Sequence, residues 1–183
     1  MSNLTKQLIK EIFQEFSEKE ENFLTLVETG THLGKTCINL HDVFKRIYTM
    51  EISEKYFHLS CLNFQRLGIK NVDAFLGDSS KILPQLLQIL NENLFFWLDG
   101  HWSMGDTGRG EKDSPLLEEI QSIVEYCKNK KTKSIIVIDD VRIFGKQGWE
   151  DISFESVRSI AGNFIIKDYV KDDIFCLLVD GNL

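Results

Sequence analysis

The sequence lacks the cysteine patterns of zinc-binding or disulfide-stapled proteins. Its four cysteines, Cys37, Cys61, Cys127 and Cys176, lie far apart, and no two of them form a C-x-x-C pair. This spacing argues against a shared zinc site, and a chain of 183 residues does not need disulfides to fold. We therefore predict reduced thiols in a cytoplasmic protein.

Long apolar runs and an excess of basic residues are also missing. No stretch approaches the roughly 20 apolar residues of a membrane-spanning helix, and the first 16 residues alternate charged and apolar positions, unlike a signal peptide. The chain has 21 Lys and Arg against 28 Asp and Glu, a formal net charge of −7. Because phosphate backbones attract basic proteins, this balance argues against a nucleic-acid partner, and we expect no membrane partner either.

What the sequence does contain is a repeated switch between strand-like and helix-like apolar patterns. Such alternation is typical of a parallel sheet covered by helices on both faces, and we find no linker that would divide residues 1–183 into two domains. We expect strands at Phe23–Glu28, Arg46–Glu51, Val72–Leu76, Leu94–Asp99, Ser134–Asp139, Phe164–Tyr169 and Asp173–Val179. We expect helices at Leu4–Phe16, Gly34–Lys45, Ser53–Leu67, Ser79–Leu90 and Ser114–Asn129.

Some segments carry further predictions. Residues 1–17 form an N-terminal helix with one apolar face, which either covers its own sheet or pairs with a second copy in a homodimer. Ser114 and Pro115 are predicted as the cap and first residue of a helix, Ser53 as another N-cap, and Pro84 as a flaw that kinks a helix or delays its start. The Gly-rich residues 102–113 are predicted to form a lid over the reaction site.

Each of the first five predicted strands ends in, or is followed by, an acidic residue. These residues are Glu28, Glu51, Asp78, Asp99 and the pair Asp139-Asp140. Ligands of open α/β sheets bind outside the carboxyl ends of the strands. Since crowded carboxylates repel one another, we expect cations or ligand hydroxyls and amines at this edge.

The loop from Glu28 to Gly34 joins a strand to a helix, where Gly30 and Gly34 permit a tight turn and a close ligand approach. It does not fit the dinucleotide fingerprint G-x-G-x-x-G. It nearly fits a phosphate-binding loop, because it continues into Lys35-Thr36, but it has three residues between its glycines instead of four. Glu28 would also repel a triphosphate. A P-loop-like nucleotide-binding enzyme is therefore the weaker alternative.

Glu51 supports an adenosine-type ligand. It ends the next predicted strand, 23 positions after Glu28. An acid about 20 residues beyond such a loop is placed to accept hydrogen bonds from ribose hydroxyls.

Together these motifs resemble the class I S-adenosylmethionine-dependent methyltransferases. The similarity consists of E-x-G-x-x-x-G, an acid after strand two, G-D-S after strand three and L-D-G-H after strand four, and it runs from about Phe23 to Val179. The resemblance implies a Rossmann-like three-layer α/β/α sandwich, whose seven-stranded sheet is mostly parallel with an antiparallel last strand. Many family members have glycine where this chain has His32.

The resemblance also assigns site residues. Glu28, Gly30 and Gly34 would flank the methionine part of the cofactor, Glu51 would hold the ribose diol, and Asp78 and Ser79 would lie beside the adenine. The complete set of cofactor-binding residues that we expect is Glu28, Thr29, Gly30, Thr31, Gly34, Glu51, Ile52, Gly77, Asp78, Ser79, Asp99 and Gly100.

Three acids suggest a metal. Asp99, Asp139 and Asp140 end neighbouring strands, and oxygen ligands suit Mg²⁺. The arrangement resembles metal-dependent O-methyltransferases of the catechol and macrolide-sugar types, which implies catalytic roles for Asp99 and for His101 as the general base. Catechol-type enzymes use a lysine just after the corresponding acid, and this chain has none there. The implied acceptor is a small sugar, polyol or catechol-like molecule, and the remaining alternative is a non-catalytic scaffold that binds the cofactor.

Overall fold

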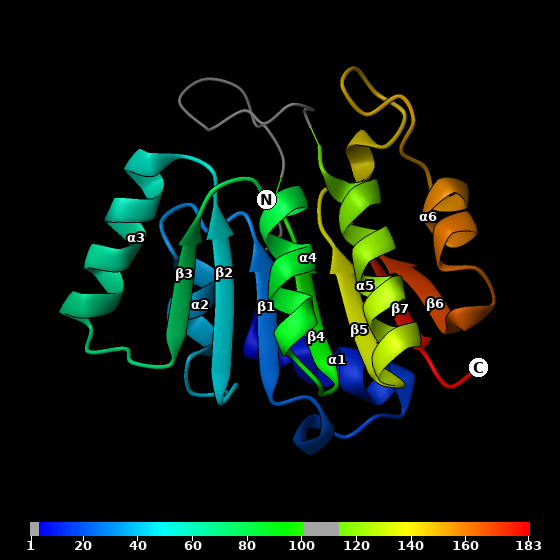
Figure 1. Cartoon of the computed structure of the whole chain (residues 1–183), viewed down its shortest axis with the longest axis horizontal. Helices are drawn as coiled ribbons and strands as arrows, with labels where there is room; N and C mark the ends of the chain where they lie inside the picture. The colour runs from blue at the N-terminus through cyan, green and yellow to red at the C-terminus, as the bar shows by residue number, and fades with distance from the viewer. Residues whose placement is uncertain (1–3, 101–113) are drawn as a thin grey trace.

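The computed structural model describes residues 4–100 and 114–183. Its centre is a seven-stranded sheet with the strand order β3-β2-β1-β4-β5-β7-β6, in which only β7 runs against the others (Figure 1). The strands are β1 (Thr25–Thr29), β2 (Arg46–Glu51), β3 (Val72–Leu76), β4 (Leu94–Leu98), β5 (Lys133–Ile138), β6 (Ile165–Lys171) and β7 (Ile174–Asp180). The predicted Rossmann-like sheet, mostly parallel with an antiparallel last strand, is confirmed.

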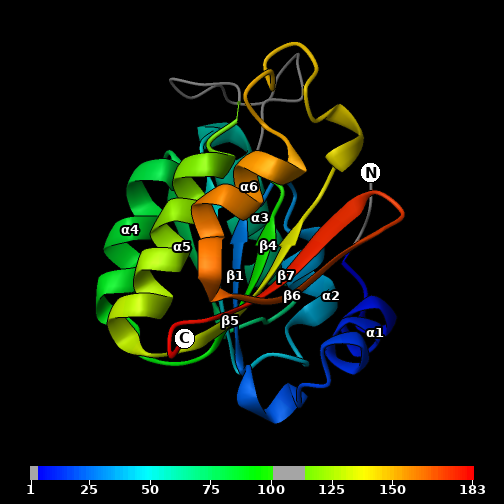
Figure 2. The same ribbon diagram turned by 90° about the vertical axis from the view of Figure 1, so that its right-hand side faces the viewer.

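Helices cover both faces of this sheet and complete the three layers. Seen along the sheet, α4, α5 and α6 lie on one side, and α1 and α2 lie on the other (Figure 2). The α-helices are α1 (Lys6–Phe16), α2 (Lys35–Leu40), α3 (Glu54–Arg66), α4 (Ser79–Ile89), α5 (Leu116–Lys130) and α6 (Phe154–Ala161). Phe64 of α3 packs into the same apolar cluster as α1 and α2.

The core has two halves because successive strand residues point to opposite faces. In β4, Phe96 packs into the layer of α4 and α5, whereas Phe95 and Trp97 pack into the layer of α1 and α2. All three are at most 1% exposed. The apolar run of β4 is thus core material, as expected for a central strand buried on both faces.

The apolar face of the N-terminal helix lies on the chain's own sheet. Ile9, Ile12, Phe13 and Phe16 are buried, and they share a cluster with Phe95 of β4. Thr5 caps the helix by accepting a hydrogen bond from the Leu8 amide at 3.1 Å. Of the two alternatives for this face, the structure has the intramolecular one. No helix of the described chain is long and apolar enough to cross a membrane.

Several predicted helix ends are wrong. α2 stops at Leu40 rather than Lys45, because the Asn71 side chain takes up the carbonyls of His41 and Phe44 in the turn that follows. Pro115 is the N-cap of α5 instead of its first residue.

The positions of two other predicted residues can be compared with the structure. Ser53 is the N-cap of α3, as predicted, although its side chain makes no capping hydrogen bond; its amide donates to Glu51. Pro84 lies inside α4 and does not delay its start, which Asp78 caps.

One helix was not predicted at all. α6 follows a loop and is short, with eight residues. Its N-terminus carries a capping box, in which Ser153 and Ser156 accept hydrogen bonds from each other's backbone amides. The usual signature of that motif has Glu or Gln at the fourth position, so the serine in its place hid the signal.

Candidate functional site: a ligand site at the carboxyl edge of the sheet

The loop after β1 folds back on the end of β2. The amides of Gly30 and Thr31 both donate to the carbonyl of Met50, at 2.9 and 3.2 Å. Gly30 has φ +85, and a Cβ placed on it would lie 2.4 Å from the carbonyl oxygen of Asp99. Only glycine fits between these two backbones, which brings the ends of β1 and β4 into direct contact.

His32 occupies the loop position where many methyltransferases have glycine. Its φ of 47 lies in the left-handed region that favours glycine. Its amide donates to Glu51 at 2.7 Å, and its ring lies 4.2 Å from the ring of Tyr56 in α3. These contacts hold a non-glycine residue in the left-handed conformation, so the loop keeps its path despite the substitution.

Glu28 lies beneath the loop and is only 1% exposed. Its Oε2 accepts hydrogen bonds from Thr49 Oγ1 at 2.6 Å and from Cys37 Sγ at 3.0 Å. Because the single hydroxyl proton of Thr49 goes to Glu28, Thr31 must donate to Thr49 in the 2.6 Å contact between them. Burial raises the pKa of Glu28. The carboxyl group therefore ties β1, β2, α2 and the loop together.

Glu51 ends β2 beside this loop, as predicted. Both of its carboxylate oxygens accept backbone amides: Oε2 from His32 at 2.7 Å and Oε1 from Ser53 at 2.8 Å. The side chain is 7% exposed. Each carboxylate oxygen has two lone pairs, so the group can still accept hydrogen bonds from a vicinal diol while the two amides hold it in place.

The end of β3 supplies the next predicted segment. Gly77, with φ +144, donates its amide to the carbonyl of Glu51 at 2.8 Å, which joins this segment to Glu51 and Ile52. Asp78 caps α4 by accepting from the amide of Ser80 at 2.9 Å and from its hydroxyl at 2.7 Å. Ser79 is buried at the first position of α4.

The end of β4 closes the arrangement. The amide of Asp99 donates to the carbonyl of Thr29 at 3.1 Å. A Cβ on Gly100 would lie 2.9 Å from Thr29 Oγ1, so the two strand ends touch again. The predicted cofactor residues thus come from four neighbouring segments at one edge of the sheet.

The three predicted metal ligands form one cluster beside these segments. Asp99, Asp139 and Asp140 each offer one carboxylate oxygen, and these oxygens lie within 4.8 Å of one another. Asp139 and Asp140 are buried. Burial, followed by the charges of Asp139 and Asp140, raises the pKa of Asp99 to about 9. A cation beside these carboxyl groups would favour their ionised forms.

A basic residue next to the cluster was not predicted. Arg142 pairs with Asp140 and with Asp173, and its backbone amide donates to Asp173 at 2.9 Å. Asp140 itself has φ 58. Arg142 therefore neutralises part of the charge and fixes the turn after β5. Nothing in its sequence context distinguishes it from an ordinary surface arginine.

Glu119 was also missed by sequence reasoning. It lies in the first turn of α5, and Thr29 Oγ1 lies 3.5 Å from its Oε2. The adjacent Glu118 gave it the appearance of the ordinary acidic first turn of a helix. His101, the predicted general base, and the predicted lid 102–113 lie outside the described residues.

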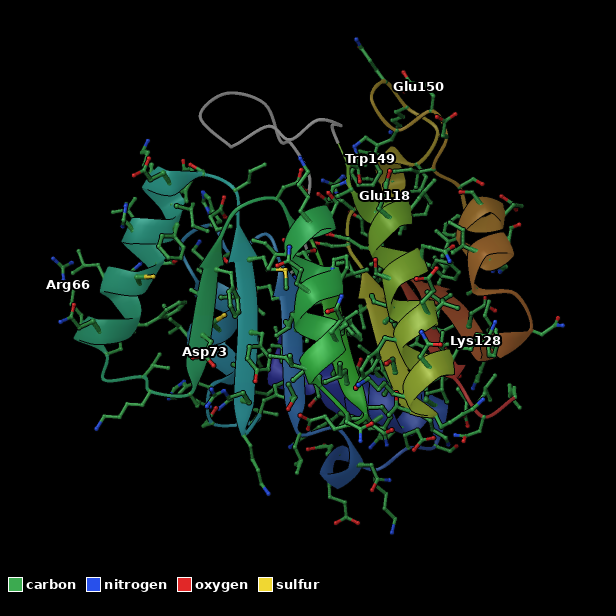
Figure 3. All side chains as sticks on the ribbon, in the orientation of Figure 1. Arg66, Asp73, Glu118, Lys128, Trp149 and Glu150 are labelled. Carbon is green, nitrogen blue, oxygen red and sulfur yellow. The ribbon has the colours of Figure 1, made fainter. Side chains whose placement is uncertain are left out.

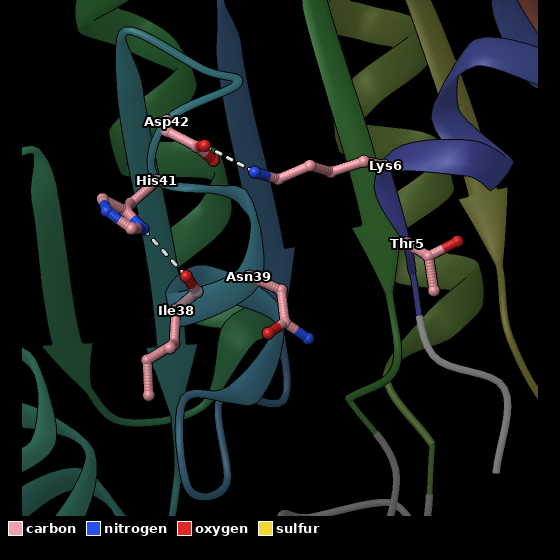
Figure 4. A pocket seen from close by; sticks show the side chains of 6 residues that line it. All are labelled: Thr5, Lys6, Ile38, Asn39, His41 and Asp42. Atoms are coloured by element: carbon pink, nitrogen blue, oxygen red, sulfur yellow. Dashed lines mark hydrogen bonds and ion pairs between the residues drawn. The ribbon is translucent and has the colours of Figure 1, made fainter.

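A hollow of about 450 Å³ lies elsewhere, between α1 and the end of α2 (Figure 4). Lys6 and Asp42 form an ion pair at 2.5 Å across it, and His41 Nδ1 lies 2.8 Å from the carbonyl oxygen of Ile38. α2 starts at the Gly30–Gly34 loop and runs away from it, so its last turn is remote from the carboxyl edge. None of the predicted site residues lines this hollow.

Solved structures with the same fold include several methyltransferases. An O-methyltransferase from Bacillus cereus in complex with SAH has a TM-score of 0.61 at 16% identity over 97% of this chain and 82% of that one. A putative methyltransferase from Streptococcus mutans in complex with SAH has a TM-score of 0.60 at 14% identity over 98% and 99%. An rRNA methylase from Streptococcus thermophilus has a TM-score of 0.57 at 14% identity over 98% of both chains.

This chain has the fold of those enzymes. No protein-family model matches it, and no curated protein does. At these identities the likeness concerns the fold, and two of the three proteins bear names that indicate different acceptors. Function has to be argued from the site.

Proposed function

We propose that the chain is an S-adenosylmethionine-dependent methyltransferase that methylates a hydroxyl group of a small acceptor with the help of a divalent cation. The observation that carries this proposal is the meeting of four predicted cofactor-binding segments at one edge of the sheet. Across the sheet they follow one another in the order Asp78-Ser79 after β3, Glu51 at the end of β2, the glycine loop after β1 and Asp99-Gly100 after β4. A long, polar ligand such as S-adenosylmethionine suits this row.

The cofactor would extend across the strand ends. Gly30 and Gly34 leave room for the methionine part against the backbone, and Glu51 accepts the ribose hydroxyls. Asp78 and Ser79 border the adenine. Glu28 would support the loop rather than contact the cofactor, because its carboxyl group is buried under the loop and accepts hydrogen bonds from Thr49 and Cys37.

The acidic cluster fits a divalent cation. Two oxygen ligands on opposite sides of one Mg²⁺ lie about 4.2 Å apart, so the 4.8 Å spread of the three carboxylate oxygens needs only small side-chain movements. Asp99, Asp139 and Asp140 would hold the ion. Bound there, it would supply Lewis acidity that lowers the pKa of an acceptor hydroxyl.

The remaining roles fall to the chain's own residues. Asp99 belongs both to the cofactor row and to the acidic cluster, so it sets the distance between methyl donor and acceptor. His101, two residues further on, would accept the proton of the attacking hydroxyl. A small sugar or another diol presents two neighbouring oxygens to such a site, and we propose this class of acceptor.

Methyl transfer tests the proposal. Radiolabelled S-adenosylmethionine is incubated with catechol and with a panel of sugars and polyols, each with Mg²⁺ or with a chelator. We expect label in at least one acceptor, at least ~10-fold less with chelator, and the same loss for Asp139→Asn. The exposed Asp42→Asn is the matched control and keeps full activity.

Transfer that is unaffected by chelator and by Asp139→Asn contradicts metal assistance. Cofactor binding without transfer to any acceptor favours a non-catalytic scaffold.

A further inference from the structure

Glu119 is an acid in a place where an apolar residue would be expected. It lies in the first turn of α5 and is only 1% exposed, with the buried Leu116 and Ile120 as helix neighbours. α5 begins at the carboxyl edge of the sheet, as the position of the adjacent Glu118 near the upper end of the helix shows (Figure 3). The Glu119 carboxyl group is therefore buried on the side of the candidate site.

Its contacts come from two different segments of that site. Thr29 Oγ1, at the end of β1, donates to Oε2 across 3.5 Å. The hydroxyl of Ser79, at the start of α4, lies near the same carboxyl group and lowers its pKa. By distance and angle, Oε1 has no hydrogen-bond partner among the described residues.

Thr29 connects this carboxyl group to the end of β4. Its hydroxyl lies so close to Gly100 that a Cβ there would come within 2.9 Å of Oγ1. Glu119, Thr29 and Gly100 thus form a continuous line from the helix to the site.

The charges around Glu119 do not favour its ionised form. Burial is the main cause that raises its pKa, to about 7, and Asp78 on α4 and Glu118 on α5 raise it further. An apolar side chain of similar size would fill this space without the cost of burying a carboxyl group. Acids kept in such places are common at functional sites.

We propose that Glu119 is a positioning residue that joins two cofactor-binding segments, Thr29 and Ser79, and that it does so in its ionised form. This inference rests on the proposed function, since it assigns a role in binding the adenosyl cofactor. A carboxylate only accepts hydrogen bonds, so it can hold both hydroxyls at once. A protonated carboxyl group is a weaker acceptor than a carboxylate, so it holds the two hydroxyls less firmly.

The measurable consequence is a pH-dependent affinity for the cofactor. With a pKa of about 7, Glu119 is mostly protonated at about pH 6 and mostly ionised at about pH 8. If binding needs the ionised form, the Kd for S-adenosylhomocysteine falls about tenfold between these two pH values. A glutamine side chain cannot titrate, so in the Glu119→Gln variant the contribution of this position to the Kd does not change with pH.

Calorimetry with S-adenosylhomocysteine at about pH 6, 7 and 8 tests this for the whole protein. We expect the wild type to show the tenfold change and Glu119→Gln to show less than about twofold. Glu125→Gln, an exposed position on the same helix, is the matched control and keeps the wild-type profile. A purely structural role would lower the melting temperature of Glu119→Gln but leave the pH profile unchanged.

The outcomes separate the two claims. If the wild type does not bind S-adenosylhomocysteine at any pH, the proposed function fails. If it binds and Glu119→Gln keeps the tenfold change, the inference about Glu119 is overturned. Should Glu119→Gln not fold, Thr29→Val tests the same link: it removes one donor to the carboxylate, so the midpoint of the pH dependence must move upward. An unchanged midpoint overturns the inference as well.

Discussion

Glu51 has a structural role in addition to the ligand-binding role that we propose for it. It accepts the amides of His32 and Ser53 and so shapes the loop above it, and in the proposed function it also accepts the ribose hydroxyls. A single substitution such as Glu51→Ala would therefore change both the affinity for the cofactor and the free energy of unfolding. Substitutions of graded severity are needed to tell the two effects apart.

For Glu51→Ala we expect cofactor affinity to fall by roughly 10- to 100-fold and the free energy of unfolding to fall by about 1 kcal/mol, because two partly buried backbone hydrogen bonds lose their acceptor. Glu51→Gln keeps one acceptor oxygen, so its affinity should lie between wild type and Glu51→Ala. Calorimetry and urea unfolding measure the two quantities. Glu54→Ala, an exposed acid three residues on, is the control. A Glu51→Ala variant that binds as tightly as wild type contradicts the ribose assignment.

Single residues also show how far sequence reasoning reaches. The acids at the strand ends could be predicted, because their positions follow directly from the apolar pattern of the strands. The direction of each carboxyl group could not: Glu28 points down to Cys37, whereas Glu51 points to the loop. Glu119 looked like a solvated residue of a helix start, and only its packing against Thr29 reveals its burial.

At the scale of elements, the contact between the ends of β1 and β4 determines the shape of the site. Gly30 is the residue that makes this contact feasible, since any Cβ would meet the Asp99 carbonyl at 2.4 Å. Its positive φ of +85 is a second requirement. The steric contact with Asp99 and the strain of a positive φ can be separated experimentally, because other glycines in the chain have a positive φ and open space around them.

Gly30→Ala should cost several kcal/mol of stability and abolish cofactor binding, since the β1 loop or the end of β4 has to move. Gly68→Ala is the matched control: Gly68 has φ +68, but a Cβ placed on it would meet no atom within 4 Å. Its cost should be only the backbone strain of about 1–2 kcal/mol. Thermal unfolding and calorimetry of both variants give the comparison. Equal effects for the two would show that steric contact with Asp99 is unimportant.

The packing of α5 against β1 and α4 carries a pH dependence of stability. Burial raises the pKa of Glu119 from 4.5 to about 7, so the unfolded chain loses this proton first as pH rises. The wild type should therefore lose roughly 3 kcal/mol relative to Glu119→Gln between pH 4.5 and about pH 7, with little further change above that. Urea unfolding across this range measures the difference. A constant difference between the two proteins contradicts the burial of a titrating carboxyl group.

Elements differ in how well they could be predicted. β2 and β3 were predicted to the residue, because β2 runs from Arg46 to Glu51 and β3 lies between the turn residues Asn71 and Gly77. α2 was predicted too long, since a side chain distant in sequence, Asn71, completes its final turn. α6 was not predicted, because it is short and its capping box uses an unusual residue. One error thus comes from a tertiary contact and the other from a local sequence signal.

At the scale of the whole molecule, acidic residues outnumber basic ones, which gives a net charge of −7. Asp99, Asp139 and Asp140 lie together at the carboxyl edge of the sheet, where Arg142 pairs with Asp140. Repulsion among the three carboxylates disfavours their ionised forms in the folded state. A cation that binds there relieves it and stabilises the fold by mass action.

We therefore expect Mg²⁺ to raise the melting temperature. At about ten times its Kd, a ligand adds about 1.4 kcal/mol, which corresponds to roughly 3–6 °C for a chain of this size. Asp139→Asn should lose most of this shift, and an equal ionic strength of Na⁺ should not produce it. Differential scanning calorimetry gives the values. An equal shift in Asp139→Asn would locate the bound ion somewhere else.

The central claim is that the carboxyl edge of the sheet binds S-adenosylmethionine. The most direct test is calorimetric titration of the wild-type protein with S-adenosylmethionine, with ATP and Mg²⁺ as the comparison ligand. We predict one binding site with a Kd in the micromolar range, about −8 kcal/mol, and no heat with ATP. Binding of ATP and Mg²⁺ without binding of S-adenosylmethionine would contradict this claim.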